Sequence, residues 1–222
     1  MAVFTKLLKD DIEKFISNYS IGNLEKFEEI VDGIENSNFK IFCNNQPYIL
    51  TIFEKRVIEE ELPYFINLKN FLNKNNFKCP KAISDKNGKI LKKIKNKTAI
   101  IISFLEGKSV EKPNFEMCKE VGKMIGNLHN LTVNFDEKRP NSLDLKDWKD
   151  IYKKCLDNKS EGFNETMYLL KNEIDYLENY WPNNIPCGVI HADLFRDNIF
   201  FKNGKISGVI DFYFSCYYFY VY

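Results

Sequence analysis

Residues 188–213 read GVIHADLFRDNIFFKNGKISGVIDFY, and the interpretation of the whole chain starts from this stretch. Its first part is a loop that holds His191, Asp193 and Asn198 in the spacing H-x-D-x-x-x-x-N. This spacing alone is a weak pattern, because an acidic loop beside an ordinary hairpin would also produce it. The residues after Asn198 make the pattern more specific.

Two short apolar runs, 199–202 and 206–210, come directly after the loop. Asn203-Gly204 lies between them and is the strongest short-range signal for a two-residue hairpin turn. The second run leads into Asp211. We therefore expect a loop, a strand, a tight turn and a second strand that brings an acid back to the loop.

These residue types suit phosphoryl transfer. An acceptor hydroxyl needs a carboxylate that orients it and takes its proton, and Asp193 fits this role. Magnesium prefers a few hard oxygen ligands, which the Asn198 carbonyl and the Asp211 carboxylate would provide. We expect His191 to hold the loop's shape through backbone hydrogen bonds, and Asp197 to be solvated.

The motifs HADLFRDNIFF and VIDFY resemble the superfamily of aminoglycoside and choline phosphotransferases, which has a protein-kinase-like fold. The stretches VDGIENSNF, YILTIFEKR and ELPYFINLKNFL resemble, within that superfamily, the homoserine kinase family. The resemblance implies ATP and Mg²⁺ as cofactors and L-homoserine as the acceptor, phosphorylated on the route to threonine. Choline-type and aminoglycoside-type kinases stay open as alternatives.

The expected fold class is α+β with two lobes. We expect a nucleotide-binding N-lobe over residues 1–105, with a five-stranded antiparallel sheet and one main helix. A mostly helical C-lobe carrying the catalytic hairpin would span residues 106–222. The periodicity of apolar residues predicts helices over 10–19 and 62–75, and strands over 24–30, 39–43, 48–52 and 98–104. Residues 79–84 and 89–94 flank an expected turn at Asn87-Gly88.

The loop between the first two strands reads Gly-Ile-Glu-Asn-Ser-Asn at positions 33–38. A glycine and small polar residues let backbone N–H groups approach phosphate closely. We expect phosphate contacts from Gly33, Asn36, Ser37 and Asn38, whereas a plain polar hairpin loop is the alternative.

Thr51 occupies the strand position at which many kinases have a phosphate-binding lysine. Homoserine kinases of this type resemble the chain in having threonine there. The missing charge would come from Lys55 or Arg56, unless metal and backbone suffice, although for each of the two a solvated surface position is slightly favoured. A non-catalytic nucleotide-binding protein therefore stays open.

The resemblance implies that residues 103–107 join the lobes, with backbone groups of Phe104 and Leu105 reading the adenine edge. Further along the chain, the sequence predicts helices that begin at Pro113-Asn114, near Trp148 and near Met167. His129 is expected to pack against its helix rather than to act in catalysis.

The chain has 32 basic and 31 acidic residues, a net charge of +1, which gives no electrostatic argument for nucleic acid or an acidic membrane. Its six cysteines include no C-x-x-C pair, and neither a signal pattern nor a membrane-length apolar run is present. A cytoplasmic protein with reduced thiols is the simplest interpretation.

Residues 212–222 read FYFSCYYFYVY, eleven residues with eight aromatics. Such a run needs cover, and members of the resembled family continue through further helices that shape the acceptor site. We therefore expect a C-terminally truncated chain. The groups that bind the acceptor's amino and carboxylate ends, and the oligomeric state, are not readable from the sequence.

Overall fold

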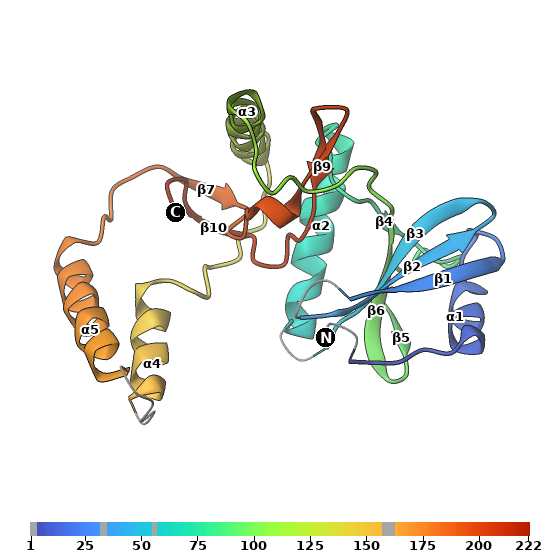
Figure 1. Ribbon diagram of the computed structural model, residues 1–222, viewed down its shortest axis with the longest axis horizontal. Helices are drawn as coiled ribbons and strands as arrows, with labels where there is room; N and C mark the ends of the chain where they lie inside the picture. The colour runs from blue at the N-terminus through green and yellow to red at the C-terminus, as the bar shows by residue number, and fades with distance from the viewer. Residues whose placement is uncertain (1–3, 32–34, 55–56, 157–162) are drawn as a thin grey trace.

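The structure is a computed structural model that describes residues 4–31, 35–54, 57–156 and 163–222. A β-sheet lies at one end of the molecule and two helices, α4 (Leu145–Cys155) and α5 (Phe163–Tyr180), lie at the other (Figure 1). Helix α2 (Leu62–Lys74) stands between the sheet and the C-terminal half. Within the described ranges, no helix has the length and hydropathy that a membrane crossing requires.

The sheet contains six described strands, all paired antiparallel, in the order β1-β2-β3-β6-β4 with β5 also paired to β6. The strand bounds are β1 (Leu24–Ile30), β2 (Ser37–Cys43), β3 (Gln46–Ile52), β4 (Ala82–Ile83), β5 (Lys92–Ile94) and β6 (Lys97–Ser103). Strand β6, predicted from its apolar run, is central and pairs with β3, β4 and β5. The sequence thus located β1, β2, β3 and β6.

The expected number of five strands was wrong, because both short strands after α2 join the sheet. The Asp85 carboxylate accepts hydrogen bonds of 2.8 Å from the backbone N–H groups of Asn87 and Lys89, which closes a turn between β4 and β5. A second turn at Lys95-Asn96, with φ values of 48° and 63°, folds β5 onto β6. Both strands therefore pair with β6 and not with each other.

One hydrophobic cluster lies between the sheet and α1 (Lys9–Ile16). The predicted apolar face of this first helical segment is confirmed, since Ile12, Phe15, Ile16 and Tyr19 are all buried. Alternate residues of β3 and β6, such as Leu50 and Ile101, point to the same cluster. Helix α2 packs against the opposite face of the sheet, where Ile100 of β6 belongs to the second cluster.

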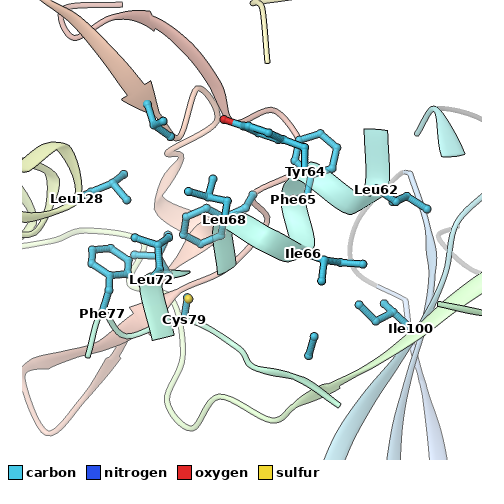
Figure 2. Packing of buried hydrophobic residues seen from close by; sticks show 14 of the residues in the cluster. Leu62, Tyr64, Phe65, Ile66, Leu68, Leu72, Phe77, Cys79, Ile100 and Leu128 are labelled. Carbon is cyan, nitrogen blue, oxygen red and sulfur yellow. The ribbon is translucent and has the colours of Figure 1, made fainter. Parts of the chain in front are cut away.

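The second cluster is built on α2 and joins the two halves of the molecule (Figure 2). Leu62, Phe65, Ile66 and Leu72, the residues predicted to face the core, are all buried. They pack with residues of the sheet and of the C-terminal half, namely Ile100, Leu128, Val189, Val209 and Phe212. Burial of each large apolar side chain is worth about 1.5–3 kcal/mol, so this cluster holds the halves together.

The remaining elements are η1 (Glu59–Glu61), α3 (Phe115–Thr132), β7 (Cys187–Ile190), η2 (Arg196–Asn198), β8 (Ile199–Lys202), β9 (Lys205–Val209) and β10 (Cys216–Phe219). Helix α3 begins as predicted after Asn114, whose side chain accepts a hydrogen bond from the Met117 N–H group. Helix α3 packs against β7 and β9. This places the catalytic stretch between α2 and α3.

The aromatic segment after Asp211 was not predicted to form a strand, yet Cys216–Phe219 pair with β7 as β10. Aromatic side chains on both faces give no period-2 pattern, which is why the strand was missed. Phe212 and Cys216 are buried, while Val221 is 82% exposed. The segment is thus covered at its beginning and exposed at its end.

Candidate active site

Strands β8 and β9 form the predicted hairpin. Lys202 pairs with Lys205, and the turn residues Asn203 and Gly204 have φ values of 52° and 74°. Positive φ at both central positions is what a two-residue type I′ turn requires. The returning strand therefore ends beside the loop from which the hairpin started, as expected from the Asn-Gly signal.

The loop before the hairpin is held by His191, which is 4% exposed. Its Nε2 lies 2.9 Å from the Ile210 carbonyl oxygen, and its Nδ1 accepts the Asp193 N–H at 3.3 Å. Because Nδ1 accepts, the proton is on Nε2, which donates to the carbonyl. Burial lowers the pKa of His191 to about 4, so the ring is neutral near pH 7. The histidine ties loop to strand, which is the shape-holding role predicted for it.

Asn198 and Asp193 are joined by their side chains. The amide nitrogen Nδ2 of Asn198 donates to the Asp193 backbone carbonyl at 2.8 Å and to Asp193 Oδ2 at 3.1 Å. With its nitrogen directed at Asp193, the amide has its carbonyl oxygen left for another partner, and that oxygen accepts but does not donate. The arrangement orients the carboxylate and presents a metal-type ligand next to it.

Asp211 comes directly after β9 in the left-handed backbone region, with a φ of 63°. Its Oδ1 is buried and has no hydrogen-bond partner within the described part of the chain. Burial, together with the charges of Asp193 and Glu35, raises the pKa of Asp211 to about 6. A covered carboxylate oxygen without a donor is an unusual arrangement that a bound cation explains.

The four residues predicted to contact phosphate differ in what the structure shows. Gly33 lies outside the described residues. Asn36 is 8% exposed, and its Oδ1 is buried without a hydrogen-bond partner in the described ranges. Ser37 and Asn38 were expected in the loop but begin β2, and Asn38 Oδ1 accepts a hydrogen bond of 2.8 Å from Thr51 Oγ1 across the β2–β3 pair.

Ser37 has its hydroxyl fully engaged within the protein. The oxygen accepts the N–H groups of Phe4 and Thr5 at 2.9 and 3.0 Å and donates to Glu54 Oε1 at 2.6 Å. Its side chain is completely buried. A contact of Ser37 with phosphate is therefore left to its backbone.

Phe104 and Leu105 follow β6 directly and are half-buried. Two residues further on, Gly107 has a φ of 111°, and an added Cβ would lie 2.6 Å from the Phe201 carbonyl oxygen. Lys108 and Phe201 exchange two backbone hydrogen bonds, of 3.1 and 2.9 Å. The connection that was predicted to join the lobes is thus fastened directly to the catalytic hairpin.

His129 packs as expected, since its ring stacks on Tyr220 with centroids 4.3 Å apart. Burial lowers its pKa. Arg196 is exposed and donates to the Glu111 carbonyl oxygen at 2.5 Å, and Asp197 is exposed. These three residues belong to the surroundings of the site.

Two charged residues near Asp211 were missed by the sequence interpretation. Glu35 acts on Asp211 electrostatically from the loop before β2, and Lys69 acts on it from α2. Burial lowers the pKa of Lys69 to about 8, against the opposing charge of Asp211. The signal was present in the sequence, because position 69 continues the spacing of the predicted buried face, where a lysine is out of place. The expected cations Lys55 and Arg56 lie outside the described residues.

The hairpin, the loop carboxylate and the two halves joined through α2 define the class of protein-kinase-like phosphotransferases. The model of the phosphotransferase enzyme family matches residues 26–222. The chain therefore belongs to the phosphotransferase enzyme family, and the resemblance seen in its catalytic motifs is confirmed.

Curated relatives narrow the comparison. Homoserine kinase of Agrobacterium fabrum is 40% identical over 216 residues, which cover 97% of this chain and 67% of the relative. Homoserine kinase of Bartonella henselae is 41% identical over 216 residues, with 97% and 68% covered. The chain spans about two thirds of the length of these relatives.

Solved structures give the same fold at low sequence identity. An amicoumacin kinase in complex with AMP-PNP, Ca²⁺ and Ami superimposes with a TM-score of 0.76 and 15% identity, covering 96% of this chain and 66% of that one. Spectinomycin phosphotransferase in complex with ADP and spectinomycin gives a TM-score of 0.76 and 12% identity, covering 97% and 72%. The expected α+β protein-kinase-like fold is confirmed.

Proposed function

We propose that this chain carries the nucleotide-binding and catalytic parts of a homoserine kinase. The reaction transfers the γ-phosphoryl group of ATP to the side-chain hydroxyl of L-homoserine. The observation that supports phosphoryl transfer most directly is the Asp193–Asn198 pair beside Asp211, whose Oδ1 has no described hydrogen-bond partner. We place the nucleotide-binding N-lobe at residues 1–105 and the catalytic C-lobe at residues 106–222.

Asp193 is assigned to the acceptor hydroxyl. Its Oδ2 is held by Asn198, so the carboxylate is oriented before the acceptor arrives, and it takes the hydroxyl proton as phosphorus–oxygen bond formation proceeds. The backbone N–H of Asp193 is bonded to His191, which fixes the loop against the end of β9. Positioning of this kind supplies most of the catalysis expected for phosphoryl transfer.

Asn198 and Asp211 are assigned to Mg²⁺. The Oδ1 of Asp211, which has no hydrogen-bond partner among the described residues, and the amide carbonyl of Asn198 are hard oxygen donors of the kind that Mg²⁺ prefers. Bound there, the metal would neutralise phosphate charge and orient the nucleotide. The residues present therefore fit the cation.

ATP is assigned to the region between the sheet and the C-terminal half. The loop that contains Gly33 and Asn36 and the first residues of β2, Ser37 and Asn38, would cover the phosphates, with Ser37 contributing through its backbone. Backbone groups of Phe104 and Leu105 would contact the adenine. Both assignments follow the class of fold, in which the nucleotide lies between the lobes.

L-Homoserine as the acceptor is supported by two curated homoserine kinases at 40% and 41% identity. A physical argument agrees with it. An aminoglycoside is polycationic and favours a strongly acidic site, whereas this chain is balanced at a net charge of +1. A zwitterion needs one cation and one anion and no biased surface. We place the reaction in threonine biosynthesis and, because all six cysteines are free thiols, in the cytoplasm.

The experiment that tests this proposal measures ADP release by the full-length protein with Mg-ATP and four acceptors in parallel: L-homoserine, choline, kanamycin and methylthioribose. We expect the highest kcat/KM with L-homoserine. A higher value with choline or kanamycin would overturn the substrate and leave only the phosphotransferase class. Nucleotide binding without ADP release for any acceptor would favour a non-catalytic binding protein.

A further inference from the structure

Arg139 lies in the connection between α3 and α4, and it is buried. Its Nε and Nη2 both donate to Glu61 Oε2, at 2.9 and 2.8 Å. Nη2 also donates to Ser142 Oγ at 3.1 Å, and Nη1 donates to the backbone carbonyl oxygens of Pro140 and Ser215 at 3.4 and 3.5 Å. A guanidinium has five N–H donors, and each of them is used here. The side chain is therefore fixed in one orientation.

The segment that carries Arg139 runs along α2 in the direction opposite to the helix. Phe135 packs on Phe71 near the C-terminal end of α2, with ring centroids 5.3 Å apart. Glu137 Oε1 then accepts a hydrogen bond of 2.8 Å from Asn67 Nδ2, in the middle of the helix. Arg139 completes the series at the residue directly before α2. Contacts along its length thus fasten α2 to a connection of the C-terminal half.

Arg139 also contacts the chain that follows Asp211. Its Nη1 reaches the Ser215 carbonyl oxygen, and its own backbone carbonyl oxygen accepts the N–H of Tyr217 at 2.7 Å. Ser215 is completely buried, and its hydroxyl donates to the His191 carbonyl oxygen at 3.4 Å. Arg139 therefore joins the start of α2 to the segment between Asp211 and β10, which in turn contacts the catalytic loop.

Aromatic packing connects the same parts of the molecule. The Arg139 guanidinium lies 5.2 Å from the centroid of the ring of Phe65, which is labelled on α2 in Figure 2. Phe65 meets Tyr213 edge to face, with centroids 5.6 Å apart. Tyr213 is two residues from Asp211 in the chain. A change at Arg139 is thus transmitted to the surroundings of Asp211 by packing as well as by hydrogen bonds.

We propose that Arg139 is a positioning residue for phosphoryl transfer, which holds α2 and the segment after Asp211 at a fixed separation through its bonds to Glu61 and Ser215. This inference rests on the proposed kinase function and adds a residue to it. The nucleotide of this fold class lies between the lobes, so the separation of these two parts sets the place of the phosphates relative to Asp193. A misplacement of about 1 Å, even from a change far from the chemistry, costs up to about 10²-fold in rate.

The test uses the full-length protein and compares Arg139→Lys with Asp85→Asn. Lysine keeps the charge but lacks the planar fork that reaches Glu61 and Ser215 at once. Asp85 is buried and pairs with Lys92 at 2.8 Å in the turn between β4 and β5, so its variant also weakens a buried ion pair. For Arg139→Lys we expect kcat to fall about 10- to 100-fold while the KM for L-homoserine stays within about twofold. For Asp85→Asn we expect kcat to stay within about twofold.

Thermal unfolding separates positioning from stability. Both variants should have a lower thermal midpoint, because each leaves a buried charged group with fewer partners. Only Arg139→Lys should have a lower kcat when rates are measured well below the midpoint of each protein. Unchanged kcat in Arg139→Lys, a loss confined to KM, or an equal loss of kcat in Asp85→Asn would overturn the positioning role.

Glu61→Gln changes the same ion pair from its partly exposed side. It should also lower kcat with little change in KM, and it serves as the test if Arg139→Lys folds poorly. Unchanged kcat in Glu61→Gln would then overturn the role of Arg139. Absence of ADP release from the unmodified protein with every acceptor would instead overturn the proposed function, and the positioning role with it.

Discussion

The amide nitrogen Nδ2 of Asn198 donates hydrogen bonds to two oxygens of Asp193, the backbone carbonyl oxygen at 2.8 Å and the carboxylate Oδ2 at 3.1 Å. One amide group thus fixes both the loop and the direction of the carboxylate. The backbone N–H of Ile210 donates to the backbone carbonyl oxygen of Asn198 at 2.9 Å, so Asn198 also ties the loop to the end of β9. The proposed base is oriented by protein contacts before any substrate binds.

In the full-length protein, Asp193→Asn is expected to lower kcat about 10²- to 10⁴-fold with nucleotide affinity nearly unchanged, because the change removes the base and keeps the shape of the side chain. Steady-state kinetics and Mg-ATP titration measure the two quantities. Asp197→Asn, an exposed position in the same loop, is the matched control and should retain turnover. Near-normal kcat in Asp193→Asn would remove this residue from the chemistry.

Asp211→Ala is expected to abolish the dependence of ATP binding on Mg²⁺, because the change removes the only carboxylate assigned to the metal. Calorimetric titrations with ATP in the presence and absence of Mg²⁺ give the comparison. In the unmodified protein, Mg²⁺ should tighten ATP binding. If Mg²⁺ tightens binding equally in Asp211→Ala, the buried carboxylate is structural.

His191 gives a pH dependence with a definite sign. Its pKa is about 4 in the folded protein and 6.5 ordinarily, so between these values the unfolded chain binds a proton that the folded protein does not. The contribution of the neutral His191 ring to the free energy of unfolding is fully present above pH 6.5. This contribution is lost as the pH falls towards 4, which lowers the free energy of unfolding by about 3 kcal/mol.

His191→Gln keeps a donor for the Ile210 carbonyl but does not titrate. Denaturant unfolding at pH 7 and pH 4.5 should therefore show a smaller loss of stability on acidification in the variant than in the unmodified protein. Asp211, whose pKa is raised to about 6, makes the free energy of unfolding rise on acidification. This effect is the same in both proteins and therefore cancels when they are compared. Equal losses in the two proteins would mean that His191 is protonated in the fold.

Gly107→Ala should damage the connection between the lobes. Gly107 and Gly88 both have positive φ, 111° and 80°, so alanine strains the backbone at each by about 1 kcal/mol. At Gly107 the added Cβ would also lie 2.6 Å from the Phe201 carbonyl oxygen, whereas at Gly88 nothing lies within 4 Å. Denaturant unfolding should show a loss for Gly107→Ala about 1–3 kcal/mol larger than for Gly88→Ala. Similar losses would show that the hairpin tolerates the displacement.

The hairpin, most of the sheet and the buried face of α2 could be predicted because each has a local signal. The Asn203-Gly204 turn fixes a register on its own, and strict alternation in 39–43 and 48–52 marks strands with one covered face. Strand β10 has no such signal, because its aromatic residues crowd both faces and its partner, β7, lies far away in the sequence.

Side-chain partners were less predictable than backbone elements. The pairing of Asn198 with Asp193 needs the 3₁₀ turn at 196–198, and the engagement of Ser37 with Glu54 needs two strands in register. Lys69 could have been recognised from its place in the apolar spacing of α2, but only the fold shows that the charge of Asp211 acts on it.

Phosphorus NMR of the full-length protein with Mg-ATP and L-homoserine tests the central claim most directly, because it identifies the bond that forms. The account predicts that the γ-phosphoryl resonance of ATP is replaced by a phosphomonoester resonance coupled to the two protons of the homoserine side-chain CH₂–O group, and that Asp193→Asn slows its appearance about 10²- to 10⁴-fold. Conversion of ATP to inorganic phosphate alone, or formation of the ester at an unchanged rate in Asp193→Asn, would contradict it.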